Sequence, residues 1–278
     1  MKTRIITALL LAPALVICLL YANFYLISGI AFIASLIGIY EFFSVSGLSK
    51  KFSLYFPAFL GALLITLSNL FFKEYHSIFL ALWLFVSFVF LLVFNKKLNA
   101  SDIALMFFSI LYIPNLFSYI PLVLNLENGR LIIWFIFIGA YLTDSFAYFV
   151  GIFFGKHKLC PSISPKKTVE GALGGILGSC LGFLLAGALF NSFGLNFNLL
   201  SLALVGIIAS VISQIGDLSA SVIKRAFNVK DYGNLFPGHG GILDRFDSVM
   251  LAAPMMYYCI LLAQFLKDSA MFATFFVV

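Results

Sequence analysis

Charged residues are scarce in this sequence. Only 10% of the 278 residues are Asp, Glu, Lys or Arg, whereas soluble globular proteins carry roughly 25%. Hydrophobic residues make up 63% of the chain and aromatic residues 17%, which is more apolar surface than a single soluble core can bury. The composition therefore excludes a cytosolic enzyme and a disordered chain, and it indicates a polytopic integral membrane protein.

Cysteine is also scarce, and its spacing excludes two further classes of protein. Cys18, Cys160, Cys180 and Cys259 stand far apart, in a pattern that fits neither a zinc site nor a disulfide framework. We expect them to act as small buried apolar residues. The net charge of +6 is typical of a nucleic-acid-binding protein, but basic cytoplasmic loops explain it better in so apolar a chain. We therefore expect no nucleic-acid partner.

Long apolar segments dominate what remains. A bilayer core about 30 Å thick requires roughly 17–25 apolar residues per helix, and nine segments meet this requirement: 5–21, 24–46, 53–72, 77–95, 102–124, 131–154, 171–192, 198–220 and 248–266. We predict an all-α polytopic fold with about nine transmembrane helices. The first segment is interpreted as an uncleaved span, because the second begins directly after Asn23 without a small-residue cleavage site.

The distribution of basic residues predicts the orientation. With a cytoplasmic N-terminus, only Lys73, Arg130 and Lys267 lie in outer segments, and all other Lys and Arg residues lie in inner ones. Because cytoplasmic loops are enriched in Lys and Arg, we predict a cytoplasmic N-terminus and an outer C-terminus. We predict that residues 1–130 form a scaffold of about five helices. Residues 131–278 are predicted to form a catalytic region of about four helices with two cytoplasmic loops.

Two features inside the spans have competing interpretations. Glu41 lies within the second span, where a carboxylate is costly and faces the protein interior or water; we favour a structural hydrogen-bonding role. Gly174, Gly178 and Gly182 recur every four residues on one helix face, where small residues allow close helix packing. The favoured interpretation is tight packing within the chain, with a dimer interface as the alternative.

Half of the charged residues lie in two windows, 144–170 and 217–247. Their acids include Asp144 inside the sixth span and Asp217 near the cytoplasmic end of the eighth, together with Asp244 and Asp247, whose spacing of three puts them on one helix face. Carboxylates that converge repel one another unless a cation lies between them, and hard oxygen ligands suit Mg²⁺. The alternative is a set of ion pairs with Arg and Lys at helix ends.

The bases in the same windows suit phosphate. Lys166 and Lys167 follow Ser164-Pro165, which favours a turn or a helix start, and Lys224-Arg225 follow Ser221 just past the eighth span. Basic side chains beside acid-held Mg²⁺ are typical of polyphosphate sites. The alternative is a basic anchor for lipid headgroups, which explains the sign of the charge but not its interleaving with acids.

A glycine-rich segment lies between these charges. Residues Gly238, His239, Gly240 and Gly241 follow Pro237, and their flexible backbone could bring free N–H groups close to phosphate. A glycine-rich loop alone is weak support for such a site, and His239 alone would be structural. Flanking acids and bases make the loop part of a dense polar region.

Two segments of the chain resemble a known family. The run PGHGGILDRFDS from Pro237 to Ser248, preceded by segments 221–225 and 230–234, strongly resembles the C-terminal pattern of the phosphatidate cytidylyltransferase (CDP-diacylglycerol synthase) family. A second block, Asp144 to Gly171 with PSISPKKTVEG at its end, is similar to the same family. One departure is Ala220, where many members have Glu.

The resemblance implies a nucleotidyltransferase reaction, CTP + phosphatidate → CDP-diacylglycerol + pyrophosphate, in phospholipid biosynthesis, with Mg²⁺ and room for a second cation. It implies a bacterial-type cytoplasmic (inner) membrane, an active site that faces the cytoplasm, and a homodimer. The expected roles divide into three sets. Catalytic residues are Asp217, Asp244, Asp247, Lys224, Arg225 and Arg245; substrate-binding residues are Lys166, Lys167, Ser221, Gly238, His239, Gly240 and Gly241; metal ligands are Asp217, Asp244, Asp247 and Asp144.

Two rival functions stay open. A CTP-dependent polyprenol or phytol kinase, or an archaeal-type CDP-lipid synthase, would share the phosphate chemistry but use another acceptor. An ion-coupled transporter would use Asp144, Asp217 and Glu41 as pathway residues, although the sequence lacks paired broken spans in two halves. A membrane scaffold would not require interleaved acids and bases.

Overall fold

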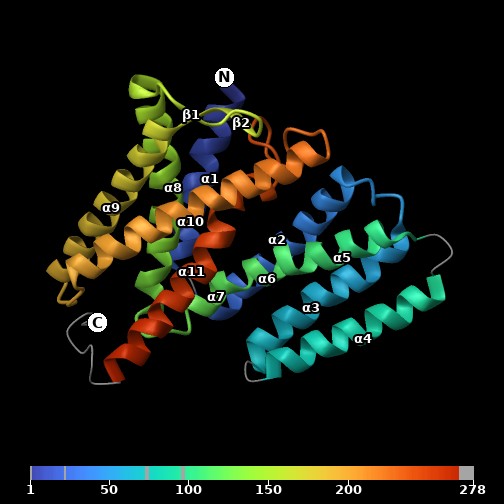
Figure 1. The fold of residues 1–278 in the computed structure, drawn as a ribbon. Coiled ribbons are helices and arrows are strands. Elements are labelled where there is room, and N and C mark those ends of the chain that lie inside the picture. Colours follow the sequence, from blue (N-terminus) through green and yellow to red (C-terminus); the bar gives the residue numbers. More distant parts are fainter. Residues whose placement is uncertain (1, 22, 73–74, 95–97, 269–278) are drawn as a thin grey trace. The chain divides into compact units, whose positions relative to one another are not determined.

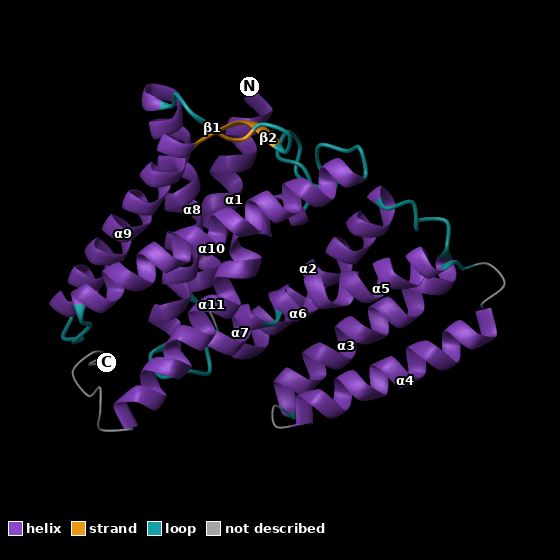
Figure 2. Cartoon of the chain, in the orientation of Figure 1, coloured by secondary structure: helices purple, strands orange, loops and turns teal. Residues whose placement is uncertain are grey.

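The computed structural model describes residues 2–21, 23–72, 75–94 and 98–268. Most of the described residues are helical, and they include one short hairpin of two strands (Figures 1 and 2). The elements are α1 (Lys2–Leu20), α2 (Phe24–Val45), η1 (Phe52–Leu54), α3 (Tyr55–Phe71), α4 (His76–Phe94), α5 (Ala100–Tyr112), α6 (Pro114–Phe117), α7 (Tyr119–Val123), α8 (Gly129–Phe154), β1 (Lys158–Cys160), β2 (Ser164–Thr168), α9 (Val169–Ser192), α10 (Leu199–Ala226) and α11 (Leu243–Asp268).

The predicted all-α membrane architecture is confirmed. Within the described residues, eight helical stretches are long and apolar enough to cross a bilayer, and a shorter apolar stretch, Leu9–Leu20, lies in α1. The protein is therefore an all-α polytopic membrane protein. The fifth predicted span is divided into α5, α6 and α7, since Pro114 and Pro121 lack the N–H group that a continuous helix would use.

Two sequence-based boundaries are wrong near the charged windows. Helix α10 continues to Ala226, so Lys224 and Arg225 lie in its last turn rather than past it; the apolar run ends earlier than the helix because one face of its last turns is polar. Ser164 and Pro165 begin strand β2 instead of a helix or turn. Helix α9 starts after Thr168, whose side chain accepts a hydrogen bond from the N–H of Gly171.

The chain forms two compact units, which are described separately. The first comprises Met1–Asn125 and Ala226–Phe246, and the second comprises Leu126–Arg225 and Asp247–Val278. The observed grouping places the glycine-rich segment with the N-terminal helices. The predicted functional division at residue 130 stays a prediction. In the first unit, the ring centroids of Phe246 and Phe117 are 5.4 Å apart, which fastens this segment to α6.

Close helix packing organises the second unit. Helices α8 and α9 lie side by side, and the glycines of the four-residue repeat face α8. A Cβ atom added at Gly178 would lie 2.3 Å from the ring of Phe146, and one at Gly182 would lie 2.2 Å from Leu142. The prediction of tight packing within the chain is confirmed for this stripe.

Candidate functional site

A cavity of about 550 Å³ lies within the second unit. Its walls come from α8, the β1–β2 hairpin, the start of α9 and α10, and four predicted site residues line it: Asp144, Lys166, Lys167 and Asp217. This volume is in the range of small-molecule sites, roughly 300–1,000 Å³. The cavity is therefore the candidate active site.

The hairpin places two of the basic residues. Strands β1 and β2 pair antiparallel, with Lys158 opposite Thr168 and Cys160 opposite Ser164. The hairpin's tip is tied to α10, because the Nε of Arg225 donates a hydrogen bond of 3.3 Å to the carbonyl of Ile163. Arg225 thus contacts the protein backbone in this structure, and its predicted contact with substrate stays a prediction.

Glu170 holds the incoming arm of the hairpin. Its carboxylate accepts hydrogen bonds from the backbone N–H groups of Lys156 at 3.0 Å and His157 at 3.2 Å, and it pairs with the His157 ring at 2.6 Å. Glu170 also lies in the first turn of α9, where its negative charge interacts favourably with the positive end of the helix dipole. The hairpin is therefore held at its tip by Arg225 and at its base by Glu170.

Three carboxylates of the second unit converge near the cavity. Asp247 of α11 interacts electrostatically with Asp217 of α10 and Asp144 of α8. The close approach of α10 and α11 permits this, since a Cβ atom added at Gly216 would lie 2.6 Å from the carbonyl oxygen of Asp247. The Oγ of Ser248 donates to Asp144 at 3.3 Å. Residues from three different helices thus form one acidic group.

Two lysines offset this negative charge. Lys167 forms an ion pair and hydrogen bond with Asp217, and the Nζ of Lys224 lies 4.0 Å from Oδ2 of Asp247. The side chains of Lys224 and Asp247 are 10% and 13% exposed, so this pair is poorly screened by water. The helix-end ion pairs that we weighed against a metal site are therefore present.

The acids were also tested as ligands for a divalent cation. The described part of the chain holds no group of three or more His, Cys, Asp or Glu side chains that could hold a metal ion. Mg²⁺ is usually held by one or two carboxylates, water and substrate phosphates rather than by an all-protein cage. Asp217 and Asp247, with Asp144 beside them, are hard oxygen donors of the type that such a site requires, and their ligation of Mg²⁺ stays a prediction.

The glycine-rich segment belongs to the first unit. Its turn is closed by hydrogen bonds from the N–H of Phe236 to the carbonyl of Gly240 at 2.9 Å and from the N–H of His239 to that of Phe236 at 2.8 Å. Gly238 and Gly240 have φ angles of 78° and 82°, in a region that only glycine adopts readily. The Nδ1 atom of His239 is buried without a hydrogen-bond partner among the described residues.

Asp244 has a structural task in this unit. Its Oδ2 accepts hydrogen bonds from the backbone N–H groups of Tyr232 at 2.7 Å and Gly241 at 2.9 Å, and the residue is 6% exposed. The N–H of Gly241 thus serves the loop itself. Metal ligation by Asp244 and phosphate binding by Gly241 stay predictions, as do the substrate contacts of Arg245, which is exposed in the first turn of α11, and of Ser221 on α10.

Sequence reasoning missed three residues that line the cavity: Tyr148, Lys158 and Gln214. Gln214 donates hydrogen bonds to the carbonyl of Ala172 at 3.2 Å and to the Oγ of Ser210 at 3.3 Å. The helical spacing contained a signal for two of them, because Tyr148 is four residues after Asp144 and Gln214 is three before Asp217.

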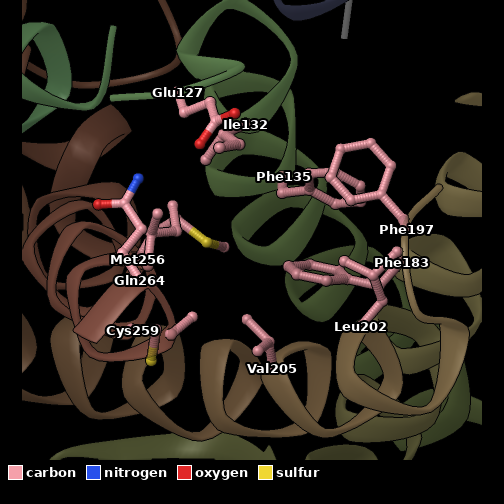
Figure 3. Close-up of a pocket in the computed structure, with 12 residues that line it drawn as sticks. Glu127, Ile132, Phe135, Phe183, Phe197, Leu202, Val205, Met256, Cys259 and Gln264 are labelled. Carbon is pink, nitrogen blue, oxygen red and sulfur yellow. The ribbon is translucent and has the colours of Figure 1, made fainter. Parts of the chain in front are cut away.

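A second hollow in the same unit is apolar. It measures about 80 Å³ and is lined by side chains that include Phe135, Phe183 and Phe197 (Figure 3). The three rings lie together on one side of the hollow, and Glu127 stands at its edge. Because it lacks paired acids and bases, this hollow does not offer the phosphate chemistry of the larger cavity.

The sequence was compared with known proteins. A model of the cytidylyltransferase family matches residues 2–263. The chain belongs to the cytidylyltransferase family. Phosphatidate cytidylyltransferase of Staphylococcus epidermidis is 43% identical over 162 residues, which cover 58% of this chain and 60% of that protein. The enzyme of the same name from Bacillus subtilis is 43% identical over 153 residues, 55% of this chain and 56% of the relative.

A third cytidylyltransferase, the phosphatidate cytidylyltransferase of Staphylococcus aureus, is 47% identical over 130 residues, which are 47% of this chain and 49% of that protein. The matched stretch spans less than two thirds of the length of each of these relatives.

Proposed function

We propose that this member of the cytidylyltransferase family transfers CMP from CTP to phosphatidate and yields CDP-diacylglycerol and pyrophosphate. The observation that carries the proposal is the cavity of about 550 Å³ in which Asp144 and Asp217 face Lys166 and Lys167. The names of the relatives support phosphatidate as the acceptor. Bacterial relatives also favour the cytoplasmic membrane as the location.

The chemistry of the reaction matches the residues that are present. The phosphomonoester of phosphatidate has a second pKa of about 6, so it is an anionic nucleophile at neutral pH and needs no general base. Its oxygen forms a new bond to the α-phosphorus of CTP, and the bond from that phosphorus to the bridging oxygen of pyrophosphate breaks. The difficulty is to bring two polyanions together, which requires positioning and fixed positive charge.

Lysines on β2 perform the positioning in this proposal. Lys166 and Lys167 lie on the cavity wall, where they would bind the phosphates of CTP and of the lipid, with Lys158 as a further cation. Lys167 would have to share its charge between Asp217 and a phosphate oxygen. When bound by Asp217, Asp247 and Asp144, Mg²⁺ would neutralise phosphate charge and stabilise the leaving pyrophosphate.

The membrane gives this site a reason for its location. Phosphatidate keeps two acyl chains in the bilayer while CTP stays in water, so a polar cavity at the ends of membrane helices would serve both. The excess of Lys and Arg in the predicted inner loops supports a cytoplasmic site, where CTP is present. Homodimer formation is proposed from the family resemblance and would be measured by the mass of the detergent-solubilised protein.

The direct test is an assay with purified protein, phosphatidate, CTP labelled at the α-phosphate, and Mg²⁺. We expect labelled CDP-diacylglycerol and one pyrophosphate per lipid product, and we expect both to disappear when EDTA removes the cation. A parallel reaction contains a polyprenol or phytol in place of phosphatidate. Absence of any nucleotide-dependent product from phosphatidate would contradict the proposal.

The parallel reaction separates the rivals. A phosphorylated isoprenoid, with CDP released from CTP, would assign the protein to the kinase class instead. Ion flux in proteoliposomes without turnover of CTP would favour the transporter.

A further inference from the structure

A buried carboxylate of the first unit caps a helix from a distant part of the sequence. Glu41 of α2 is 5% exposed, and its two oxygens accept hydrogen bonds from the backbone N–H groups of Ile242 at 2.9 Å and Leu243 at 3.1 Å. The first N–H groups of a helix lack partners within the helix. Glu41 therefore supplies, across 201 positions, the acceptors that the start of α11 requires.

The glycine-rich segment is shaped around this carboxylate. A Cβ atom added at Gly241 would lie 2.3 Å from Oε1 of Glu41, and one added at Gly233 would lie 2.7 Å from the same oxygen. Real Cβ atoms essentially never show contacts this short, so the carboxylate would have to move. The absence of a side chain at these two positions is thus what lets the segment close on Glu41.

Asp244 completes the arrangement from the other side. Its Oδ2 receives the N–H groups of Tyr232 and Gly241, while Glu41 receives those of the next two residues in the chain, Ile242 and Leu243. Two carboxylates therefore bind three consecutive backbone N–H groups and fix both ends of the segment. A buried carboxylate without such partners would cost several kcal/mol, so this set of bonds defines one backbone shape.

We propose that Glu41 is a positioning residue for catalysis: by capping α11 from α2, it holds the segment 232–243 in one backbone shape and fixes the start of α11, the helix that carries Asp247 one turn further on. The proposal rests on the proposed function, and it assigns a catalytic consequence to a residue in the N-terminal helices, distant in sequence from the charged windows. Glu41 itself need not touch substrate, because it acts through the backbone of the segment.

The test compares Glu41→Gln with a matched control, Asp102→Asn, in the full-length protein. Glutamine keeps the size of the side chain but replaces one acceptor oxygen by an NH₂ group that faces an N–H donor. Asp102 is likewise a buried acid of the first unit, 5% exposed, and it binds the backbone N–H of Asn99 at 2.9 Å and pairs with Lys51. It caps its own helix rather than the glycine-rich segment, so its variant reports general loss of stability.

We expect Glu41→Gln to lower kcat about 100-fold, the loss that follows a displacement of about 1 Å at a reacting centre, while Asp102→Asn lowers the thermal midpoint as much or more with kcat within about 2-fold of the wild type. Hydrogen exchange of a peptide covering 232–243 should accelerate in Glu41→Gln and stay unchanged in Asp102→Asn.

A second pair of variants tests the contact itself. Gly233→Ala should push the carboxylate away and lower kcat in the wild-type background, but it should add little in a Glu41→Ala background, where the space is free. Such non-additivity is the signature of residues in direct contact. If Glu41→Gln cannot be purified in folded form, this pair and the more conservative Glu41→Asp decide the question.

Three outcomes would overturn the proposal: wild-type kcat in Glu41→Gln, equal losses of kcat in Glu41→Gln and Asp102→Asn, or additive effects of Gly233→Ala and Glu41→Ala. Failure of the proposed function looks different. In that case the wild type makes no CDP-diacylglycerol at all, while the exchange measurement still shows whether Glu41 holds the segment.

Discussion

Three carboxylates of the second unit interact with one another, and two lysines offset their charge. Asp217 pairs with Lys167, and Asp247 lies 4.0 Å from Lys224, so two of the three acids have a cation within reach before any substrate binds. Like charges gathered in apolar surroundings reduce stability unless they are compensated. A site of this kind is suited to polyanions. A phosphate can replace the carboxylate as the partner of a lysine, and a divalent cation can replace the lysine as the partner of the carboxylate.

Replacement of one of these acids should separate activity from stability. We expect Asp247→Asn to lower kcat by at least about 100-fold, since the charge that it supplies to the reaction is lost. The thermal midpoint should change little, because the substitution removes repulsion from Asp217 and Asp144 but also the attraction to Lys224. Steady-state kinetics and thermal unfolding in detergent measure the two quantities.

The control for Asp247→Asn is Asp231→Asn, a charged residue of the same window that is exposed and outside the predicted site. It should behave like the wild type. Mg²⁺-dependent turnover close to the wild-type rate in Asp247→Asn would remove Asp247 from the predicted metal ligands.

The sequence predicted which charged residues belong to the site, but not which of them pair with one another. The charged windows identified Asp144, Asp217, Lys166 and Lys167, which share one cavity. The pairing of Lys167 with Asp217 bridges 50 positions, and no local pattern encodes it. The predicted hydrogen-bonding role of Glu41 is confirmed, but its partners at the start of α11 were equally inaccessible, because only the tertiary fold brings them together.

At the scale of elements, regular spacing predicted packing, whereas irregular backbone escaped prediction. The four-residue repeat of Gly174, Gly178 and Gly182 indicated a close helix pair, and α8 fills that role. The hairpin β1–β2 was missed because Ser164-Pro165 has strong turn and helix-start preferences, which pairing with β1 overrides. That hairpin nevertheless carries Lys166 and Lys167 to the cavity.

The α8–α9 contact supports a prediction about stability. Gly178→Ala places a methyl group 2.3 Å from the ring of Phe146, and overpacking of this kind costs about 1–3 kcal/mol in free energy of unfolding. Gly29→Ala is the matched control, since nothing lies within 4 Å of a Cβ atom there and alanine favours a helix. Unfolding in mixed micelles should show a loss for the first variant and none for the second.

An unchanged or higher free energy of unfolding in Gly178→Ala would mean that α8 and α9 separate at no cost, contrary to the observed packing. Equal losses in both variants would assign the effect to the glycine backbone rather than to the contact with Phe146.

At the scale of the whole molecule, the small number of charges matters less than their distribution. Half of them lie in the two windows, and the bias of Lys and Arg toward alternate loops predicts a cytoplasmic N-terminus. The same bias places Lys230, between α10 and α11, on the cytoplasmic side, and Asn125, between α7 and α8, on the opposite side. Both residues are exposed in the structure, so each is suitable for a chemical probe.

This orientation can be tested with single cysteines in a background in which Cys18, Cys160, Cys180 and Cys259 are replaced by serine or alanine. We expect a membrane-impermeant maleimide to label Lys230→Cys only in inside-out vesicles and Asn125→Cys only in right-side-out vesicles. The background without cysteine gives the level of non-specific labelling, and detergent should make both sites reactive. The reverse pattern would place the loop between α10 and α11 on the outer surface, where CTP is absent, and would contradict a cytoplasmic active site even if the purified enzyme were active.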